Sequence, residues 1–223
     1  MVGIMSGENW IGGLPPRVRD AMLERMVPRD VTAGTIVKNA GDPPSAMYHV
    51  EHGYLKLQGL HHDGQRVLIL IYRAGNNFSE SILVAHRPAN HTTVALTDAR
   101  VLRLARDDFW DLYHRYPEIP EALCRKFADN ISRQFIAREM RHTHRLRKLI
   151  TLCFENLAEH CGQASPQGEV SIPIPLTQSD LAEHYDVTRQ SVQREIGVLK
   201  SEGILSKRQG TWRIANVTML KRS

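Results

Sequence analysis

The stretch "TQSDLAEHYDVTRQSVQREIGVLKSEGIL", residues 177–205, has the pattern of two short helices separated by a turn. Thr177 is a candidate N-cap for the first helix, and Asp180 stands at the third helical position, as in a capping box. Thr188 is a candidate N-cap for the second helix, and Gly203 follows that helix as a stop signal. Two helices joined by a turn of about three to four residues are typical of a helix-turn-helix motif.

The second of these helices would bury Val192, Ile196 and Leu199 and turn its polar side chains to the opposite side. Arginine can bond bidentately to the guanine edge and glutamine to the adenine edge, and the first turns of a recognition helix reach base edges in the major groove. A polar face that only meets solvent is the alternative interpretation. The residues predicted to bind DNA are Thr177, Thr188, Arg189, Gln190, Ser191, Gln193, Arg194, Lys207 and Arg208.

Two neighbouring segments favour DNA binding over a solvated face. "ILSKRQGTWRIAN", residues 204–216, predicts a two-stranded hairpin around Gln209-Gly210, with Lys207 and Arg208 near its tip. A predicted strand over residues 171–174 precedes the two helices. Residues 177–223 contain eight Lys and Arg against five Asp and Glu, so the module is basic. The sequence therefore predicts a winged helix-turn-helix that binds double-stranded DNA.

The chain before this module has two other textures. Residues 31–104 contain short alternating apolar runs separated by turn residues, with a strong hairpin signal at Asp63-Gly64. We expect about six to eight antiparallel strands in a small barrel or sandwich, preceded by a helix over about residues 16–26. Residues 106–161 have the apolar spacing of one long helix or two nearly continuous ones. Because one side of a small barrel cannot cover so long an apolar stripe, we expect a homodimer.

The composition argues against several classes of protein. A net charge of +5 and a pI near 9.3 fit an anionic partner. The sequence lacks a run of 18 apolar residues that could span a membrane, and residues 1–10 lack the pattern of a secretory signal. We therefore expect a cytoplasmic protein, in which Cys124, Cys153 and Cys161 are reduced thiols. Because the sequence has no Gly-rich phosphate loop, GxSxG or HExxH motif, an enzyme is not expected.

A β-roll, a long helix and a winged helix-turn-helix, in this order and at this length, resemble the CRP/FNR family of bacterial transcription regulators. The resemblance implies an α+β fold, with a cyclic-nucleotide-binding-like antiparallel β-roll in residues 1–116, a dimerisation helix in 117–142 and a DNA-binding domain in 143–223. It also implies an effector-responsive homodimer on a palindromic operator and contact with RNA polymerase. Gln190 stands where the family usually has glutamate, so a different operator preference is expected.

The segment "NNFSESILVAHRPANHTTVAL", residues 76–96, departs from the members of that family that bind cyclic nucleotides. Glu80 matches the family's glutamate, but Ser79 replaces the glycine before it, and no arginine stands at the later Arg-Ser position. A buried phosphate without a bidentate cation loses much of its binding energy, which disfavours a cyclic nucleotide. The residues predicted to line an effector pocket are Asn77, Phe78, Ser79, Glu80, Arg87, Asn90, His91, Thr92, Thr93 and Arg138.

The sequence leaves the effector unknown. An iron–sulfur cluster is not expected without an N-terminal cysteine set, and lone histidines are weak support for haem. Residues at metal-ligand spacing are also lacking, which argues against zinc. A small organic effector, or none, stays open. The alternative function is that of a cyclic-nucleotide-binding regulatory subunit acting on a partner protein, which would not need a winged helix.

Overall fold

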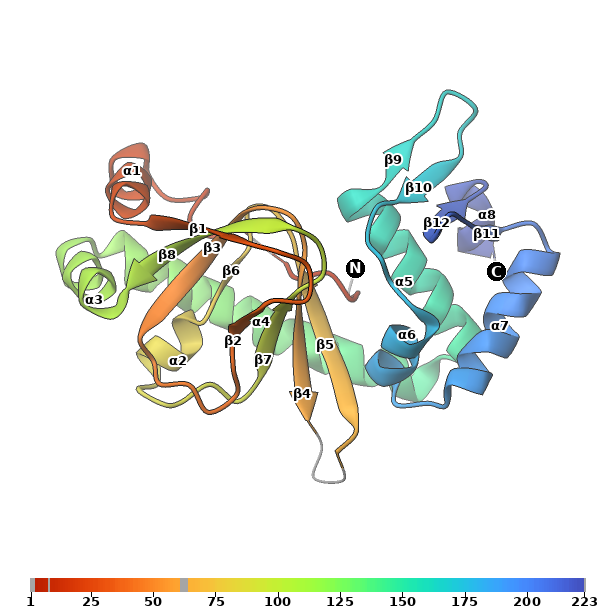
Figure 1. Ribbon diagram of the computed structural model, residues 1–223, viewed down its shortest axis with the longest axis horizontal. Helices are drawn as coiled ribbons and strands as arrows, with labels where there is room; N and C mark the ends of the chain where they lie inside the picture. The colour runs from red at the N-terminus through yellow and green to blue at the C-terminus, as the bar shows by residue number, and fades with distance from the viewer. Residues whose placement is uncertain (1–2, 8, 61–63, 223) are drawn as a thin grey trace. The chain divides into compact units, whose positions relative to one another are not determined.

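Short strands make up most of the first half of the chain, and helices make up most of the second (Figure 1). The computed structural model describes residues 3–7, 9–60 and 64–222. Two compact units are present. We call residues 6–60 with 71–132 the strand-rich unit, and residues 1–5, 61–70 and 133–223 the helical unit.

The strands of the first half form two antiparallel sheets with the orders β1-β8-β3-β6 and β2-β7-β4-β5. The elements are α1 (Pro16–Glu24), β1 (Val27–Val31), β2 (Ile36–Lys38), β3 (Ala46–His52), β4 (Leu55–Leu60), β5 (Arg66–Tyr72), β6 (Asn77–Phe78), α2 (Glu80–Val84), β7 (Thr92–Ala95), β8 (Ala99–Ala105) and α3 (Arg106–Arg115). The predicted antiparallel β-roll and the helix before it are confirmed. The predicted hairpin turn at Asp63-Gly64 includes a residue outside the described ranges.

The core of the strand-rich unit joins its N-terminal segment to the helices that follow the sheets. Each large apolar side chain that is fully buried stabilises the fold by about 1.5–3 kcal/mol relative to exposure. The buried apolar side chains of this core therefore hold the first turns of α4 (Glu118–Thr143) against the β-roll. They include Trp10, Ile11, Val18, Met22, Met47, Phe109, Leu112, Ile119 and Leu123.

The second half of the chain has the predicted winged helix-turn-helix. Its elements are α5 (Leu146–Cys161), β9 (Gln163–Ala164), β10 (Val170–Ile172), α6 (Gln178–Tyr185), α7 (Arg189–Ser201), β11 (Leu205–Arg208), β12 (Thr211–Ile214) and α8 (Val217–Arg222). The strands form one antiparallel sheet with the order β11-β12-β10-β9. Strand β10 ends at Ile172, two residues before the predicted end, and Pro173 follows it without an N–H for the ladder.

The core of the helical unit lies between α5, the two helices of the helix-turn-helix (α6 and α7) and the sheet. Phe154 on α5 meets Trp212 on β12 edge to face, with 5.3 Å between ring centroids.

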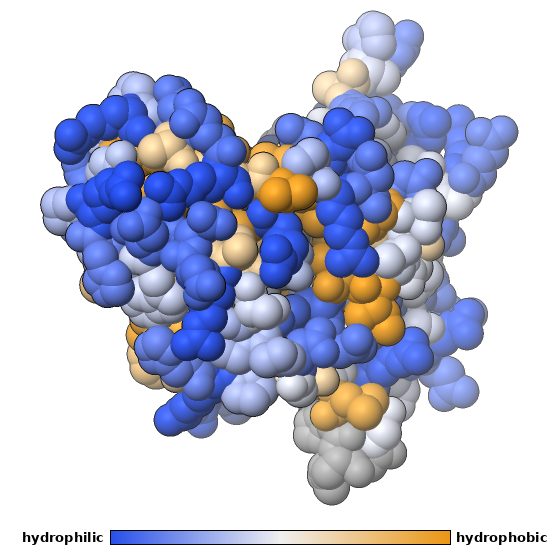
Figure 2. Space-filling model, turned by 60° about the vertical axis from the view of Figure 1, so that its left-hand side comes forward, coloured by the Kyte–Doolittle hydropathy of each residue, from blue (hydrophilic) through white to orange (hydrophobic). Residues whose placement is uncertain are grey.

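On the face drawn in Figure 2, hydrophilic residues predominate and apolar surface is limited to separate patches. Among the described residues, no helix is long and apolar enough to cross a membrane.

Candidate DNA-binding surface and sensor cavity

Two side-chain caps set where the helices of the motif begin. The Thr177 hydroxyl accepts a hydrogen bond from the Asp180 N–H at 3.0 Å, and the Asp180 carboxylate accepts one from the Thr177 N–H at 2.9 Å. This is the predicted capping box. The Thr188 hydroxyl likewise accepts from the Ser191 N–H at 3.1 Å and lies 2.9 Å from the Ser191 hydroxyl. Thr177, Thr188 and Ser191 thus fix the starts of α6 and α7.

The exposed side of α7 carries the polar side chains that the sequence singled out. Val192, Ile196 and Leu199 are buried on one side of this helix. The opposite side of the helix carries exposed polar side chains. Among the described residues, no hydrogen bond or ion pair holds those that come before Arg194 in the sequence. A surface with such free donors and acceptors can read base edges. These side chains are Arg189, Gln190 and Gln193.

Arg194 is held by a neighbour that sequence reasoning did not identify. Its Nε lies 3.3 Å from Oε1 of Glu195, whose Oε2 accepts from Arg147 Nε at 3.0 Å. These hydrogen bonds, first that from Arg147, hold the pKa of Glu195 below its usual range. Glu195 thus links an arginine of α5 to an arginine of α7. No sequence signal indicated this, because the partners lie 48 residues apart.

The hairpin of β11 and β12 is the wing of the motif, and its two predicted DNA-binding residues differ in their surroundings. Gln209 and Gly210 have φ of 48° and 81°, as a two-residue hairpin turn requires. The Lys207 ammonium lies 3.3 Å from the Leu176 carbonyl oxygen and 4.7 Å from the centroid of the Trp212 ring. Arg208 is exposed, and no such contact holds it among the described residues. Arg208 is therefore the freer of the two cations.

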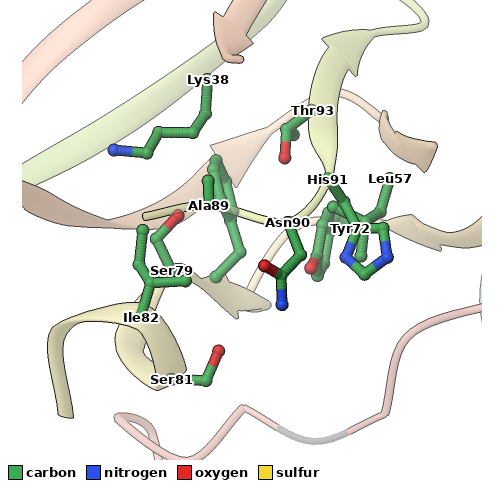
Figure 3. A pocket seen from close by; sticks show the side chains of 11 residues that line it. Lys38, Leu57, Tyr72, Ser79, Ser81, Ile82, Ala89, Asn90, His91 and Thr93 are labelled. Carbon is green, nitrogen blue, oxygen red and sulfur yellow. The ribbon is translucent and has the colours of Figure 1, made fainter. Parts of the chain in front are cut away.

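The strand-rich unit contains a small cavity, which we call the sensor cavity, of about 80 Å³ (Figure 3). Five of the predicted effector residues line it, namely Phe78, Ser79, Asn90, His91 and Thr93. Six further residues line it, namely Lys38, Leu57, Tyr72, Ser81, Ile82 and Ala89, of which the last three lie in the segment 77–93 that was expected to line the pocket.

The other predicted effector residues are not among those that line the sensor cavity. Asn77 is buried, and its side-chain oxygen lies 2.8 Å from His49 Nδ1. The Thr92 hydroxyl accepts from the Ala40 N–H at 3.1 Å, and Arg87 is exposed. Arg138 belongs to the helical unit.

Glu80, the residue that matches the family's glutamate, has partners within the protein. Its Oε1 accepts hydrogen bonds from Lys126 Nζ on α4 and from Trp10 Nε1, both at 2.7 Å. Lys126 also donates to the Asn77 carbonyl oxygen at 2.9 Å. Ser79, directly before Glu80, has a left-handed backbone with φ of 73°, a conformation that glycine adopts more readily. The Glu80 carboxylate therefore ties the β-roll to α4.

Two family models match this chain over most of its length. A model described as the cyclic nucleotide-binding domain matches residues 28–116, and one described as the Crp-like helix-turn-helix domain matches residues 144–223. The chain belongs to the CRP/FNR family of transcription regulators. As a member of this family, it is a DNA-binding regulator. The alternative function, a regulatory subunit for a partner protein, does not require a Crp-like helix-turn-helix.

Relatives of this regulator align with nearly the whole chain. It is 26% identical over 220 residues to the cyclic AMP receptor protein of Thermus thermophilus, with 97% of each chain covered. It is 23% identical over 202 residues to a CRP-like cAMP-activated global transcriptional regulator of Mycobacterium tuberculosis, with 86% of this chain and 85% of that one covered. The solved structure of the c-di-GMP-responsive global regulator CLP of Xanthomonas campestris has a TM-score of 0.76 at 16% identity, and the match covers 90% of this chain and 99% of that one.

Proposed function

We propose that this CRP/FNR regulator works as a cytoplasmic homodimer that places two α7 helices in successive major grooves of a palindromic operator. The observation that carries the proposal is the exposed side of α7, with Arg189, Gln190 and Gln193 free of partners among the described residues. Dimers of this kind bind half-sites about one helical turn apart. In this proposal the protein regulates transcription by binding, without catalysis, and contacts RNA polymerase.

The apolar surface of α4 supports pairing of two copies. Ile131, Phe135 and Ile136 are 58%, 68% and 47% exposed. Positions four apart lie on the same side of a helix, and such an apolar stripe is suited to pack against its counterpart in a second copy. We expect Phe135→Glu to give monomers in analytical ultracentrifugation. Asn130→Glu, at an exposed position turned away from Ile131, should leave the dimer intact.

A selection from randomised palindromic half-sites at fixed salt tests the operator proposal. Arg189→Ala should weaken binding to the selected site by about 1–3 kcal/mol and relax the preference at one base position. Gln190→Glu should shift one preferred base, because glutamine pairs with adenine whereas glutamate accepts from cytosine. Arg115→Ala, an exposed arginine on α3, is the control. Equal binding by all variants would contradict the proposal.

We also propose that the sensor cavity is the effector site. Five of its lining residues are ones that the family resemblance pointed to. In this proposal an effector that fills the cavity changes how the β-roll holds α4, and so changes the spacing of the two α7 helices. Measurement of operator affinity with and without a bound ligand tests this step.

A further inference from the structure

Lys38 is a buried cation without a buried anion. Its side chain is 3% exposed at the end of β2, and its Nζ donates to the Pro43 carbonyl oxygen at 2.7 Å. Within the described part of the chain, no carboxylate forms an ion pair with it. Asp42 lies nearby, but one of its carboxylate oxygens accepts from the Asn39 N–H at 2.8 Å. Buried charges are normally paired, because removing a charge from water is costly.

Burial has the expected effect on this ammonium group. It lowers the pKa of Lys38, and Asp42 opposes that shift only in part, while Arg103 adds to it. An anion beside Lys38 would remove this penalty. One neutral carbonyl partner also leaves donor capacity on the ammonium unused, since a lysine carries three N–H groups.

The hydroxyl groups around Lys38 also lack partners. Thr93 pairs with Lys38 across β2 and β7, so the two side chains lie next to each other. The Thr93 and Tyr72 side chains are buried, and neither hydroxyl has a hydrogen-bond partner among the described residues. Burial raises the pKa of Tyr72, so its hydroxyl stays a donor. Figure 3 shows the Thr93 and Ser79 hydroxyls turned toward the same space; the Lys38 stem lies beside that space, and its ammonium is turned away from Thr93.

The size of the sensor cavity limits what can fill it. About 80 Å³ holds roughly two to three water molecules, at about 30 Å³ for each. Drug-sized ligands occupy roughly 300–1,000 Å³. The volume of the sensor cavity is well below that range, so a small organic acid or a phosphate ion matches its size better than a nucleotide with its purine ring.

We propose that the sensor cavity binds a small oxyanion, a carboxylate or a phosphate, with Lys38 as its cation and the Thr93, Tyr72 and Ser79 hydroxyls as its donors. This inference rests on the proposal that the cavity is the effector site, and it names the class of effector. The cation comes from β2 and not from the family's later Arg-Ser position, where this sequence has no arginine.

Calorimetric titration of the full-length protein at constant ionic strength tests the inference. The probes are acetate, succinate and inorganic phosphate, so that the two sources of an oxyanion are separated, with cyclic AMP as a further arm. We expect saturable binding of at least one small oxyanion, weakened about 10-fold or more by Lys38→Met and weakened less by Lys38→Arg and Thr93→Val. Arg29→Met, at an exposed position on β1, should bind like the unaltered protein.

The stability of the ligand-free protein gives a second, independent readout. If Lys38 is a ligand cation, Lys38→Met relieves an uncompensated buried charge and should keep or raise the melting temperature. If Lys38 only supports the Pro43 loop, the same change should lower it.

Three results would overturn the inference: no saturable binding of any oxyanion, oxyanion binding that survives Lys38→Met, or a lower melting temperature of ligand-free Lys38→Met. If Lys38→Met does not fold, unchanged affinity in Thr93→Val would also count against it. Oxyanion binding with no effect on operator affinity would refute the effector proposal and leave this site standing.

Discussion

The buried ion pair between Lys126 and Glu80 leads to a quantitative prediction for Lys126→Met. The Lys126 side chain is 12% exposed and that of Glu80 is 3% exposed, with 2.7 Å between Nζ and Oε1. At an effective dielectric constant of about 20 the attraction is about 6 kcal/mol, part of which offsets desolvation of the two groups. Removal of one partner leaves the other charge buried, which typically costs 3–5 kcal/mol. We therefore expect the free energy of unfolding of the strand-rich unit to fall by about 3–5 kcal/mol.

Urea denaturation measures this loss when it is followed by NMR, through the indole N–H signals of the three tryptophans. Trp10 donates to the same Glu80 oxygen, so its signal reports the site directly. Arg125→Met is the matched control, because the neighbouring Arg125 forms an exposed ion pair with Glu121 one turn away. Exposed pairs contribute about 0–1 kcal/mol, so the control should lose no more than that.

A double variant separates charge from packing. Glu80→Gln combined with Lys126→Met removes the stranded carboxylate, and the glutamine oxygen can still accept from Trp10. We expect the double variant to be about 1–2 kcal/mol more stable than Lys126→Met alone. A loss of under about 1 kcal/mol in Lys126→Met would contradict a strong buried ion pair, and so would a double variant that is less stable than Lys126→Met.

Three further predictions concern the helical unit. Thr177→Ala should destabilise it by about 1 kcal/mol in urea denaturation, because the capping box is lost; an unchanged midpoint would contradict this. Arg208→Ala should weaken DNA binding equally on all sequences and reduce the salt slope by about 1, as read from titrations at several salt concentrations. Burial, opposed by the bond to the Leu68 carbonyl and assisted by Arg141, lowers the pKa of His184 from 6.5 to about 4. As the pH falls, the unfolded chain therefore takes up the proton at this histidine before the folded chain does. The contribution of His184 to the free energy of unfolding is full above about pH 6.5 and decreases by about 3 kcal/mol toward pH 4. Urea denaturation at several pH values should show this decrease, and His184→Gln should lack it.

The elements whose interactions are local could be predicted from the order of residues. The caps at Thr177 and Thr188 and the turn at Gln209-Gly210 each involve residues at most three positions apart. Their chemistry is therefore readable from the order of residues alone. The 3–4 spacing of apolar residues along α4 and α7 likewise follows from helix geometry. For this reason the winged helix-turn-helix and its exposed polar side were predicted correctly.

The contacts of polar residues in the strand-rich unit could not be predicted in this way, because they depend on the tertiary structure. Glu80 meets Lys126 across 46 residues and Trp10 across 70, and nothing near Glu80 in the sequence indicates either partner. Lys38 follows the buried Val37, and the ladder between β2 and β7 shifts register between Ile36 and Lys38. Because side chains of a regular strand alternate between its two faces, alternation would have placed Lys38 outside. The irregularity turns it inward, so the chemistry of the sensor cavity depends on a feature of sheet pairing that no local sequence pattern encodes.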